Sequence, residues 1–327
     1  MKAAVYHRYG PPEVLQIEDV PKPVPKENEV LVRVHATSVC AADWRLRKAD
    51  PFFIRIMSGW LRPTKMNILG MEFSGVVESV GSQVTKFHPG DAVFGGTGFK
   101  FGAYAEYVCL SEDGTLAPKP AKMPFEEAAA ILFGGISALS FLRKANIQAG
   151  QNVLIYGASG SVGVFAVQLA KHFGARVTGV TSTANLDLVR SLGADEVVDY
   201  TKEDFSHAGR VYDIVMDTVG KSGFSRSLRA LKRGGAYVQV GGSGKILDML
   251  GSLLRGRWAS LTGAAKIVGG MTNGLKGDHV VLKDLIEAGK LRTVIDRCFP
   301  LDQIVEAHRL AESGHKRGHA VIQIAAE

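Results

Sequence analysis

The stretch from Ile155 to Val164, IYGASGSVGV, places three glycines and two serines directly after a short apolar run. It contains the pattern A-x-G-x-x-G, a spacing that can hold the pyrophosphate of a dinucleotide at the start of a helix. Gly160 would let the backbone approach the phosphates, and Gly163 would let the helix pack closely against the sheet. We therefore predict a dinucleotide site at this turn. Its residues are Ala158, Ser159, Gly160, Ser161, Val162 and Gly163.

Two other interpretations of this turn are a nucleophilic serine and a plain connection between a strand and a helix. A serine elbow requires G-x-S-x-G, whereas from Gly157 the chain has G-A-S-G-S, with Ser161 where the last glycine should stand. The turn follows a strand-like run, opens a helix-like segment and leads to a second strand-like run. A phosphate cradle needs this context, which therefore favours the dinucleotide interpretation.

The segment at the end of the second strand-like run, VTGVTSTANLD, has no acid at the strand end. Proteins that bind NAD usually place an acid there to bind the ribose hydroxyls, and such an acid would repel a 2′-phosphate. Ser182, Thr183 and Asn185 can instead donate hydrogen bonds to that phosphate. We therefore predict NADPH as the cofactor, with NADH less favoured. Tyr200 and Val219 are also assigned to the cofactor site, while Arg190 and Lys202 are either phosphate ligands or solvated surface residues.

The elements that must position this turn are five near-continuous apolar runs, which alternate with helix-like segments ending in Gly174, Gly193 and Gly234. Such runs are typical of parallel strands buried on both faces, and glycine commonly ends a helix. The repeated units predict an α/β fold with a doubly wound parallel sheet. The runs are VLIYG (153–157), RVTGVT (176–181), EVVDY (196–200), YDIVMD (212–217) and AYVQVGG (236–242).

The chain before about residue 120 has a different pattern. The segment 29–36 alternates apolar and polar residues, and similar short β segments recur at 73–80 and 104–108 between glycines and prolines. This pattern predicts an irregular, mainly β domain. A helix near 278–288, a strand–turn–helix segment and a final strand-like AVIQI are expected to return to it.

Length and composition limit the class of protein. A chain of 327 residues is long enough for two domains, which we place at 1–125 with 270–327 and at 126–269. Hydrophobic residues make up 46% and charged residues 22%, as in ordinary globular proteins. The net charge of +7 is spread without a nucleic-acid-binding module, so nucleic acid is not an expected partner and a small anionic ligand fits better.

Cysteine usage and hydropathy narrow the cellular setting. Cys40, Cys109 and Cys298 have no C-x-x-C spacing, which argues against a disulfide framework or a structural zinc cluster. We expect a reducing compartment and a cytoplasmic protein. The longest apolar run, 128–142, is interrupted by glycines and serines and is shorter than the ~18–20 residues of a membrane span. No membrane span is expected.

Several ordered stretches resemble the medium-chain dehydrogenase/reductase superfamily, and within it the zinc-free quinone oxidoreductase-like branch. The resemblance covers essentially the whole chain. It implies a GroES-like catalytic domain formed by both chain ends, an inserted Rossmann dinucleotide-binding domain, and a homodimer. The stretches are ENEVLVRVHATSVCAADWRLR, LGMEFSGVVESVGSQVTKFHPGDAVFG, GAYAEYV, the dinucleotide segment through GADEVVDY, and AHRLAESGHKRG.

The resemblance also indicates where a catalytic zinc would be bound. The zinc-dependent alcohol dehydrogenases have G-H-E where this chain has Gly70, Met71 and Glu72, so a methionine replaces the histidine ligand. Their first cysteine ligand matches Cys40, and their third ligand position falls near Phe133. A catalytic zinc takes three protein ligands and a water, and one cysteine cannot hold it. We predict that no metal is bound.

The resemblance implies a substrate cleft beside the cofactor. Its border is expected to include Cys40, Asp43, Trp44 and Arg47, with Ser137 near the nicotinamide. These five residues are the catalytic candidates, although Asp43 is equally well explained as the cap of the following helix.

Two further segments belong to this expected site. The loop with Gly241, Gly242 and Ser243 matches the family loop that passes along the nicotinamide half of the cofactor. The aromatic and basic loop 50–66 either shapes the mouth of the cleft or forms a surface for a partner.

The leading hypothesis is a zinc-independent, NADPH-dependent oxidoreductase that transfers hydride to quinones or α,β-unsaturated carbonyl compounds. These acceptors take hydride readily, without a metal to polarise them. One alternative is a metal-free, NADP-dependent alcohol or aldehyde dehydrogenase, and the other is an NADPH-binding protein with vestigial catalysis. No residue stands out in the sequence as the proton donor.

Overall fold

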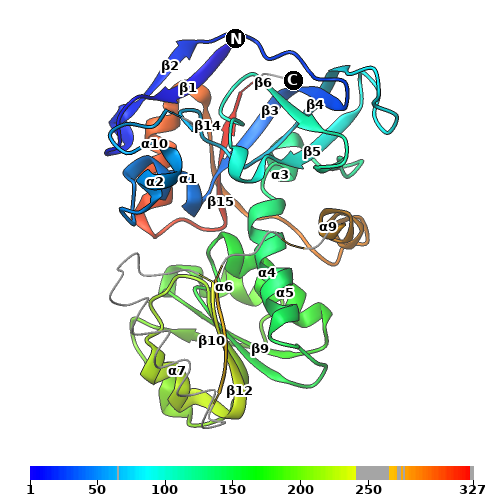
Figure 1. The fold of residues 1–327 in the computed structure, drawn as a ribbon. Coiled ribbons are helices and arrows are strands. Elements are labelled where there is room, and N and C mark those ends of the chain that lie inside the picture. The colour runs from blue at the N-terminus through cyan, green and yellow to red at the C-terminus, as the bar shows by residue number, and fades with distance from the viewer. Residues whose placement is uncertain (65, 241–264, 271–273, 275–276, 325–327) are drawn as a thin grey trace. The chain divides into compact units, whose positions relative to one another are not determined.

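The computed structural model describes residues 1–64, 66–240, 265–270, 274 and 277–324. The chain divides into two compact units (Figure 1). Unit 1 comprises Met1–Phe133, Lys276–Gly289 and Thr293–Glu327, and unit 2 comprises Gly134–Leu275 and Lys290–Arg292. Both ends of the chain therefore belong to unit 1.

Unit 2 is built on a six-stranded parallel sheet with the strand order β10-β9-β8-β11-β12-β13. The order runs outward in two directions from the neighbours β8 and β11, which confirms the doubly wound sheet that the apolar runs predict. Ligands of such sheets bind beyond the carboxyl ends of the strands at this reversal. The strands are β8 (Asn152–Tyr156), β9 (Arg176–Thr181), β10 (Glu196–Asp199), β11 (Tyr212–Asp217), β12 (Leu231–Gln239) and β13 (Lys266–Val268).

Helices cover both sides of this sheet, with α7 on one side and α4 and α5 on the other (Figure 1). Every residue of α5 from Val162 to Ala170 is buried, which explains the apolar composition of this helix. α4 lies so close to α5 that a Cβ on Gly134 would be 2.4 Å from the carbonyl oxygen of Ser161. The elements are α4 (Leu132–Lys144), α5 (Ser161–His172), α6 (Leu186–Ser191), α7 (Phe224–Ala230) and the 3-10 turns η3 (Thr183–Asn185) and η4 (Phe205–Ala208).

Unit 1 contains a seven-stranded sheet in which segments from both ends of the chain pair. Its order is β14-β15-β3-β4-β5-β7, with β6 also paired to β3, and β1 and β2 form a separate pair. β15 runs antiparallel to β3, with Val321 opposite Ser38. The strands are β1 (Lys2–Tyr6), β2 (Leu15–Asp19), β3 (Glu29–Val39), β4 (Glu72–Val80), β5 (Ala92–Gly96), β6 (Tyr107–Ser111), β7 (Thr115–Pro118), β14 (Ile295–Pro300) and β15 (His319–Gln323).

Two features of unit 1 relate directly to the sequence pattern. Val30, Val32 and Val34 of β3 are buried in one core cluster, as the alternation of apolar and polar residues predicts. Leu31 and His35 are buried as well, so this strand is covered on both faces rather than on one. The strand expected at 104–108 begins only at Tyr107. The backbone of Tyr104 instead binds Leu69 and Ala4, at 2.9 and 2.8 Å.

The helices of unit 1 pack around a second apolar core. Leu46 of α1 and Ile304 and Ala307 of α10 belong to this core, together with Tyr6 and Phe299. The elements are α1 (Ala41–Lys48), α2 (Ile54–Ser58), α3 (Phe125–Ala128), α9 (Asp278–Glu287), α10 (Ile304–Ser313) and the 3-10 turns η1 (Pro12–Val14), η2 (Gly98–Lys100) and η5 (Leu301–Gln303).

The first boundary between the units follows Phe133, further along the chain than the expected boundary at residue 125. Phe125, Ala129 and Ala130 pack in a cluster with Ala36 and Val321 of the unit 1 sheet, and this contact keeps α3 in unit 1. The stretch Phe125–Lys144 is long and apolar enough for a membrane-crossing helix, with a mean hydropathy of 1.5. However, 67% of that window is buried inside the fold, as in a core helix.

Candidate functional site

The glycine-rich turn joins β8 to α5 at the reversal of the strand order in unit 2. Gly157 has a φ of +79°, a conformation that favours glycine. The backbone N–H groups of Gly157 and Ala158 donate to the carbonyl oxygen of Val180, at 3.0 and 3.1 Å. These bonds hold the turn against the end of β9 and leave α5 to begin at Ser161.

The two later glycines of the turn have different physical reasons to be glycine. A Cβ on Gly163 would lie 2.1 Å from the carbonyl oxygen of Gly157, so the fold itself requires glycine there. Gly160 has an ordinary φ of −82°, and the nearest atom that its Cβ would meet beyond its chain neighbours is the Gly157 oxygen, at 3.5 Å. The described residues therefore leave room above Gly160. This is the space that a bound pyrophosphate would need at a helix N-terminus.

A hydrogen-bond network connects the turn to the segment after β9. The hydroxyl of Thr181 lies 2.8 Å from that of Ser159, and the side-chain amide of Asn185 donates to Ser159 and Ser182, each at 3.3 Å. Asn185 is buried, so it supports the site from beneath. Ser182 is half-buried and Thr183 is exposed, which makes them the accessible members of the predicted set.

A carboxylate that was not predicted lies behind Thr183. Asp199, the last residue of β10, is 5% exposed and accepts hydrogen bonds from the hydroxyls of Thr183 and Thr201. These bonds lower the pKa of Asp199, and Lys202 lies 3.8 Å from its carboxylate. The Thr183 hydroxyl therefore gives its proton to Asp199 and can accept, rather than donate, a hydrogen bond from a ligand. The strand end does have an acid nearby, which β10 supplies.

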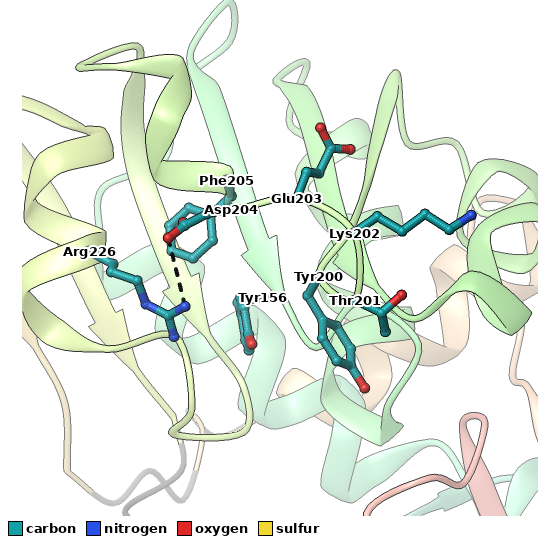
Figure 2. Close-up of a pocket in the computed structure, with 8 residues that line it drawn as sticks. All are labelled: Tyr156, Tyr200, Thr201, Lys202, Glu203, Asp204, Phe205 and Arg226. Atoms are coloured by element: carbon teal, nitrogen blue, oxygen red, sulfur yellow. Dashed lines mark ion pairs between the residues drawn. The ribbon is translucent and has the colours of Figure 1, made fainter.

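A pocket of unit 2 opens beside this cluster (Figure 2). The rings of Tyr156 and Tyr200 are 6.3 Å apart, and Tyr200 is 46% exposed. Arg226 of α7 forms an ion pair with Asp204 at 3.9 Å. The pocket therefore offers aromatic faces between basic and acidic side chains, a suitable lining for a planar, polar group. Its residues are Tyr156, Tyr200, Thr201, Lys202, Glu203, Asp204, Phe205 and Arg226.

The loop after β11 is fixed by a second carboxylate that was not predicted. Asp217 is buried and accepts hydrogen bonds from the backbone N–H groups of Val219, Gly220 and Ser222, at 3.0, 2.7 and 2.8 Å. This loop presents Val219, which is 41% exposed, at the carboxyl end of β11. The predicted residues Gly241, Gly242 and Ser243 lie outside the described residues.

Two catalytic candidates of unit 1 are held inside the fold. Asp43 is fully buried, and its two carboxylate oxygens accept the backbone N–H groups of Cys40 and Gly70, at 2.8 and 2.9 Å. It therefore caps α1 and ties this helix to the segment before β4. Burial, together with the charge of Asp43, raises the pKa of the Cys40 thiol well above its usual value. Cys40 is therefore a protonated thiol.

The other three candidates lie in different surroundings. Arg47 is fully buried and donates to the carbonyl oxygen of Gly10 at 2.7 Å and to the carboxylate of Glu312. It links α1 to α10 across the interior of unit 1. Trp44 is half-buried, and Ser137 is half-buried on α4 in unit 2.

Glu72 is a buried carboxyl group that the sequence analysis treated only as part of the G-x-E pattern. One oxygen accepts the backbone N–H of Phe133 at 2.8 Å, and the other accepts the hydroxyl of Ser38. Burial raises the pKa of Glu72 to about 7, although these hydrogen bonds oppose the shift. The carboxyl thus holds the first turn of α4 beside β3, and its place as the first residue of β4 was the available signal.

The zinc positions implied by the resemblance contain a poor set of ligands. Of the three, only Cys40 has a side chain that commonly ligates zinc, because Met71 packs against an apolar core and Phe133 has no ligating side-chain atom. Within the ranges that the structure describes, no group of three His, Cys, Asp or Glu side chains could hold a metal ion. These residues do not fit a catalytic zinc, which needs three ligands.

Comparisons with known proteins agree with this architecture. Residues 26–121 match the alcohol dehydrogenase GroES-like domain, and residues 192–322 match the zinc-binding dehydrogenase family. A 2-methylene-furan-3-one reductase of Solanum lycopersicum is 34% identical over 98% of this chain and 79% of its own length. An NADPH-dependent alkenal/one oxidoreductase of Arabidopsis thaliana is 33% identical over 98% of this chain and 79% of its own.

The fold comparison points to the same class. A quinone oxidoreductase structure from Coxiella burnetii has a TM-score of 0.88 and 34% identity, and covers 99% of both chains. A GroES-like unit joined to a doubly wound α/β unit with a glycine-rich turn defines a two-domain oxidoreductase. This chain belongs to the medium-chain dehydrogenase/reductase superfamily and is similar to its quinone oxidoreductase-like members, which confirms the resemblance seen in the sequence.

Substituting the two glycines separates packing from ligand space. Gly163→Ala places a Cβ against a rigid backbone oxygen, an overpacking cost of about 3 kcal/mol that exceeds the gain of about 1 kcal/mol from alanine in a helix. We expect the free energy of unfolding to fall by about 2 kcal/mol, and Gly160→Ala to change it by less than about 1 kcal/mol. Urea unfolding without cofactor measures both, and equal losses would contradict this assignment.

The buried Glu72 predicts a pH dependence of stability. Its pKa is raised from 4.5 to about 7, so the fold favours the protonated carboxyl. This contribution, at most about 3 kcal/mol, is fully present below the unfolded pKa and is lost as the pH rises through the folded pKa. We expect Glu72→Gln to flatten the fall in unfolding free energy between about pH 5 and about pH 7.5.

Urea unfolding at the two pH values measures this slope. Glu203→Gln, at an exposed position, is the matched control and should retain the wild-type slope. A Glu72→Gln slope equal to that of the wild type would show that Glu72 is ionised in the fold throughout this range.

Proposed function

We propose that this protein is a zinc-independent, NADPH-dependent oxidoreductase that reduces quinones or α,β-unsaturated carbonyl compounds. The observation that carries the proposal is the space above Gly160, where the described residues give no packing reason for a glycine. The space lies at the start of α5 and at the reversal of the sheet. A dinucleotide explains both facts, because its pyrophosphate needs close backbone approach and the positive end of a helix dipole.

The residues available for NADPH divide between its pyrophosphate and its adenosine end. The backbone N–H groups at the start of α5 would bind the pyrophosphate, and Ser182 would donate to the ribose 2′-phosphate. Tyr200 and Arg226 line the adjoining pocket, whose aromatic faces suit the adenine ring of the adenosine end. Lys202, beside the ionised Asp199, adds a positive charge at the same edge. When bound, NADPH supplies the hydride.

The chain's own residues restrict the acceptor. A protonated Cys40 and the apolar Met71 offer no electrophile that would polarise an unactivated carbonyl group. Quinones and enones accept hydride readily, because the developing negative charge is delocalised over the conjugated system. The reduction of a quinone then consumes one NADPH and one proton and yields a hydroquinone and NADP⁺. The similarity to a quinone oxidoreductase and to an alkenal/one oxidoreductase supports this acceptor class.

Steady-state oxidation of NADPH against quinones, enones and simple aldehydes tests this function, with NADH and a chelator as parallel arms. We expect turnover of quinones or enones that prefers NADPH and survives chelation. Alcohol-dependent reduction of NADP⁺ with little quinone turnover would instead indicate a metal-free dehydrogenase. NADPH binding without any turnover would indicate a binding protein, and loss of activity on chelation would overturn the argument from Cys40 and Met71.

The cofactor preference can be tested at Ser182. Ser182→Asp places a second carboxylate near Asp199, so repulsion of the 2′-phosphate should weaken NADPH binding by about tenfold or more. NADH has no such phosphate and should lose less than about threefold. Fluorescence titration gives both dissociation constants, and Ser182→Asn is the uncharged control. Equal losses for the two cofactors would show that Ser182 does not contact the 2′-phosphate.

A further inference from the structure

The segment after α1 exposes an unusual concentration of large apolar side chains. We call Phe52, Phe53, Ile56, Trp60 and Leu61 the apolar tip. Their exposed fractions are 55%, 41%, 71%, 59% and 83%. The described part of the chain has other exposed large apolar side chains, but they are scattered singly or in adjacent pairs. Five such side chains within ten residues of sequence are a concentration of the kind that marks an interaction site.

The fold holds this tip in place from beneath. The Tyr9 hydroxyl lies 2.6 Å from the Ser58 hydroxyl and 2.6 Å from the carbonyl oxygen of Gly59, and Ser58 is fully buried. Gly59 has a φ of +130°, and a Cβ there would lie 2.2 Å from the carbonyl oxygen of Arg62. Hydrogen bonds and close packing thus build a platform that keeps the apolar side chains pointing outward.

In and beside the tip, aromatic rings pack against one another and against an arginine. The rings of Phe52 and Trp60 meet edge to face at 5.4 Å. The Arg55 guanidinium lies 5.0 Å from the Phe52 ring and 4.8 Å from the Tyr9 ring. Arg62 is exposed directly after Leu61.

The charge around the tip is predominantly positive. Residues 44–62 contain five basic residues and one acid, Asp50. Glu312 pairs with two of the basic residues, Arg47 and Lys48, at the base of α1. Arg45 completes the set on α1, while Arg55 and Arg62 lie in the segment of the tip itself and give it positive charge.

We propose that the apolar tip docks this protein peripherally onto an anionic lipid bilayer surface. Tryptophan and phenylalanine settle at the level of the lipid headgroups, while arginine keeps its charge beside the phosphates. Basic residues near an anionic surface add electrostatic attraction to the apolar burial. The tip has this combination of side chains on a segment that is too short to span the bilayer.

The same charges argue against a second copy of this chain as the occupant. A symmetric dimer through the tip would bring together Arg55 and Arg62 of both copies in one desolvated interface. Like charges in such an interface are unfavourable. A lipid surface instead supplies the opposite charge.

Sedimentation with vesicles tests the proposal. The full chain is mixed with vesicles of phosphatidylcholine containing about 30% phosphatidylserine, and with vesicles of phosphatidylcholine alone. We expect at least about tenfold stronger partitioning to the anionic vesicles, and weaker binding as NaCl rises from about 50 mM to about 500 mM.

Variants then assign the binding to the tip. A triple variant with Phe52→Ser, Trp60→Ser and Leu61→Ser should bind the anionic vesicles about tenfold or more weakly than the wild type. Arg62→Gln should weaken binding by about fivefold. Val24→Ser is the matched control, because Val24 is as exposed as Leu61, at 83%. Circular dichroism checks the fold, and the single substitution Leu61→Ser replaces the triple variant if that variant is misfolded.

Each outcome decides the proposal. Binding to anionic vesicles that falls with the tip variants and is unchanged in Val24→Ser supports it. Failure of the wild type to bind anionic vesicles, or equal binding by the tip variants, overturns it. If sedimentation equilibrium shows instead that the tip variants only dissociate a dimer, the tip is an interface between copies and the lipid proposal is wrong. These outcomes do not depend on the substrate of the enzyme.

Discussion

The close approach of α5 to the glycine-rich turn sets the geometry of unit 2. Gly163 can lie against the carbonyl oxygen of Gly157 only because it has no side chain. This contact brings the start of α5 to the carboxyl ends of β8 and β11, where the strand order reverses. The helix amides and the helix dipole are thereby directed at one place. The hydroxyl network of Ser159 and Thr181 and the loop held by Asp217 are arranged around it.

Unit 1 uses buried carboxyl groups in the region where zinc-dependent relatives of the superfamily bind their metal. Asp43 accepts two backbone N–H groups, and Glu72 accepts one backbone N–H group and one serine hydroxyl. These hydrogen bonds tie both carboxyl groups to the scaffold. Burial of Cys40, together with the charge of the neighbouring Asp43, raises the pKa of its thiol. Local structure is thus maintained by hydrogen bonds. In the proposed function, the chemistry then depends on the cofactor and on an acceptor that needs no Lewis acid.

The apolar tip and the glycine-rich turn share one structural feature, a glycine packed against a backbone carbonyl oxygen. In both, a glycine is required by a backbone oxygen about 2 Å from where its Cβ would lie, Gly59 in the tip and Gly163 in the turn. The tightly packed backbone fixes neighbouring groups that are available to a ligand. At the turn these groups are helix amides, and at the tip they are aromatic rings and arginines. One surface suits a phosphate, and the other suits a lipid headgroup layer.

Local patterns in the sequence determined five of the six parallel strands of unit 2, the glycine-rich turn and the family, because burial on both faces and close backbone approach restrict residue types over short distances. They did not predict β13, and they assigned the start of β12 to the preceding helix. Only the tertiary structure decided which polar groups meet. Asp199 lies 16 residues after Thr183, and strand pairing between β10 and β9 brings them together. Packing likewise placed Asn185 inside the fold, although its residue type suggested a ligand contact, and Arg47, which the family resemblance had assigned to the substrate cleft. Hydrogen bonds between distant segments depend on strand order and register, which no local spacing encodes.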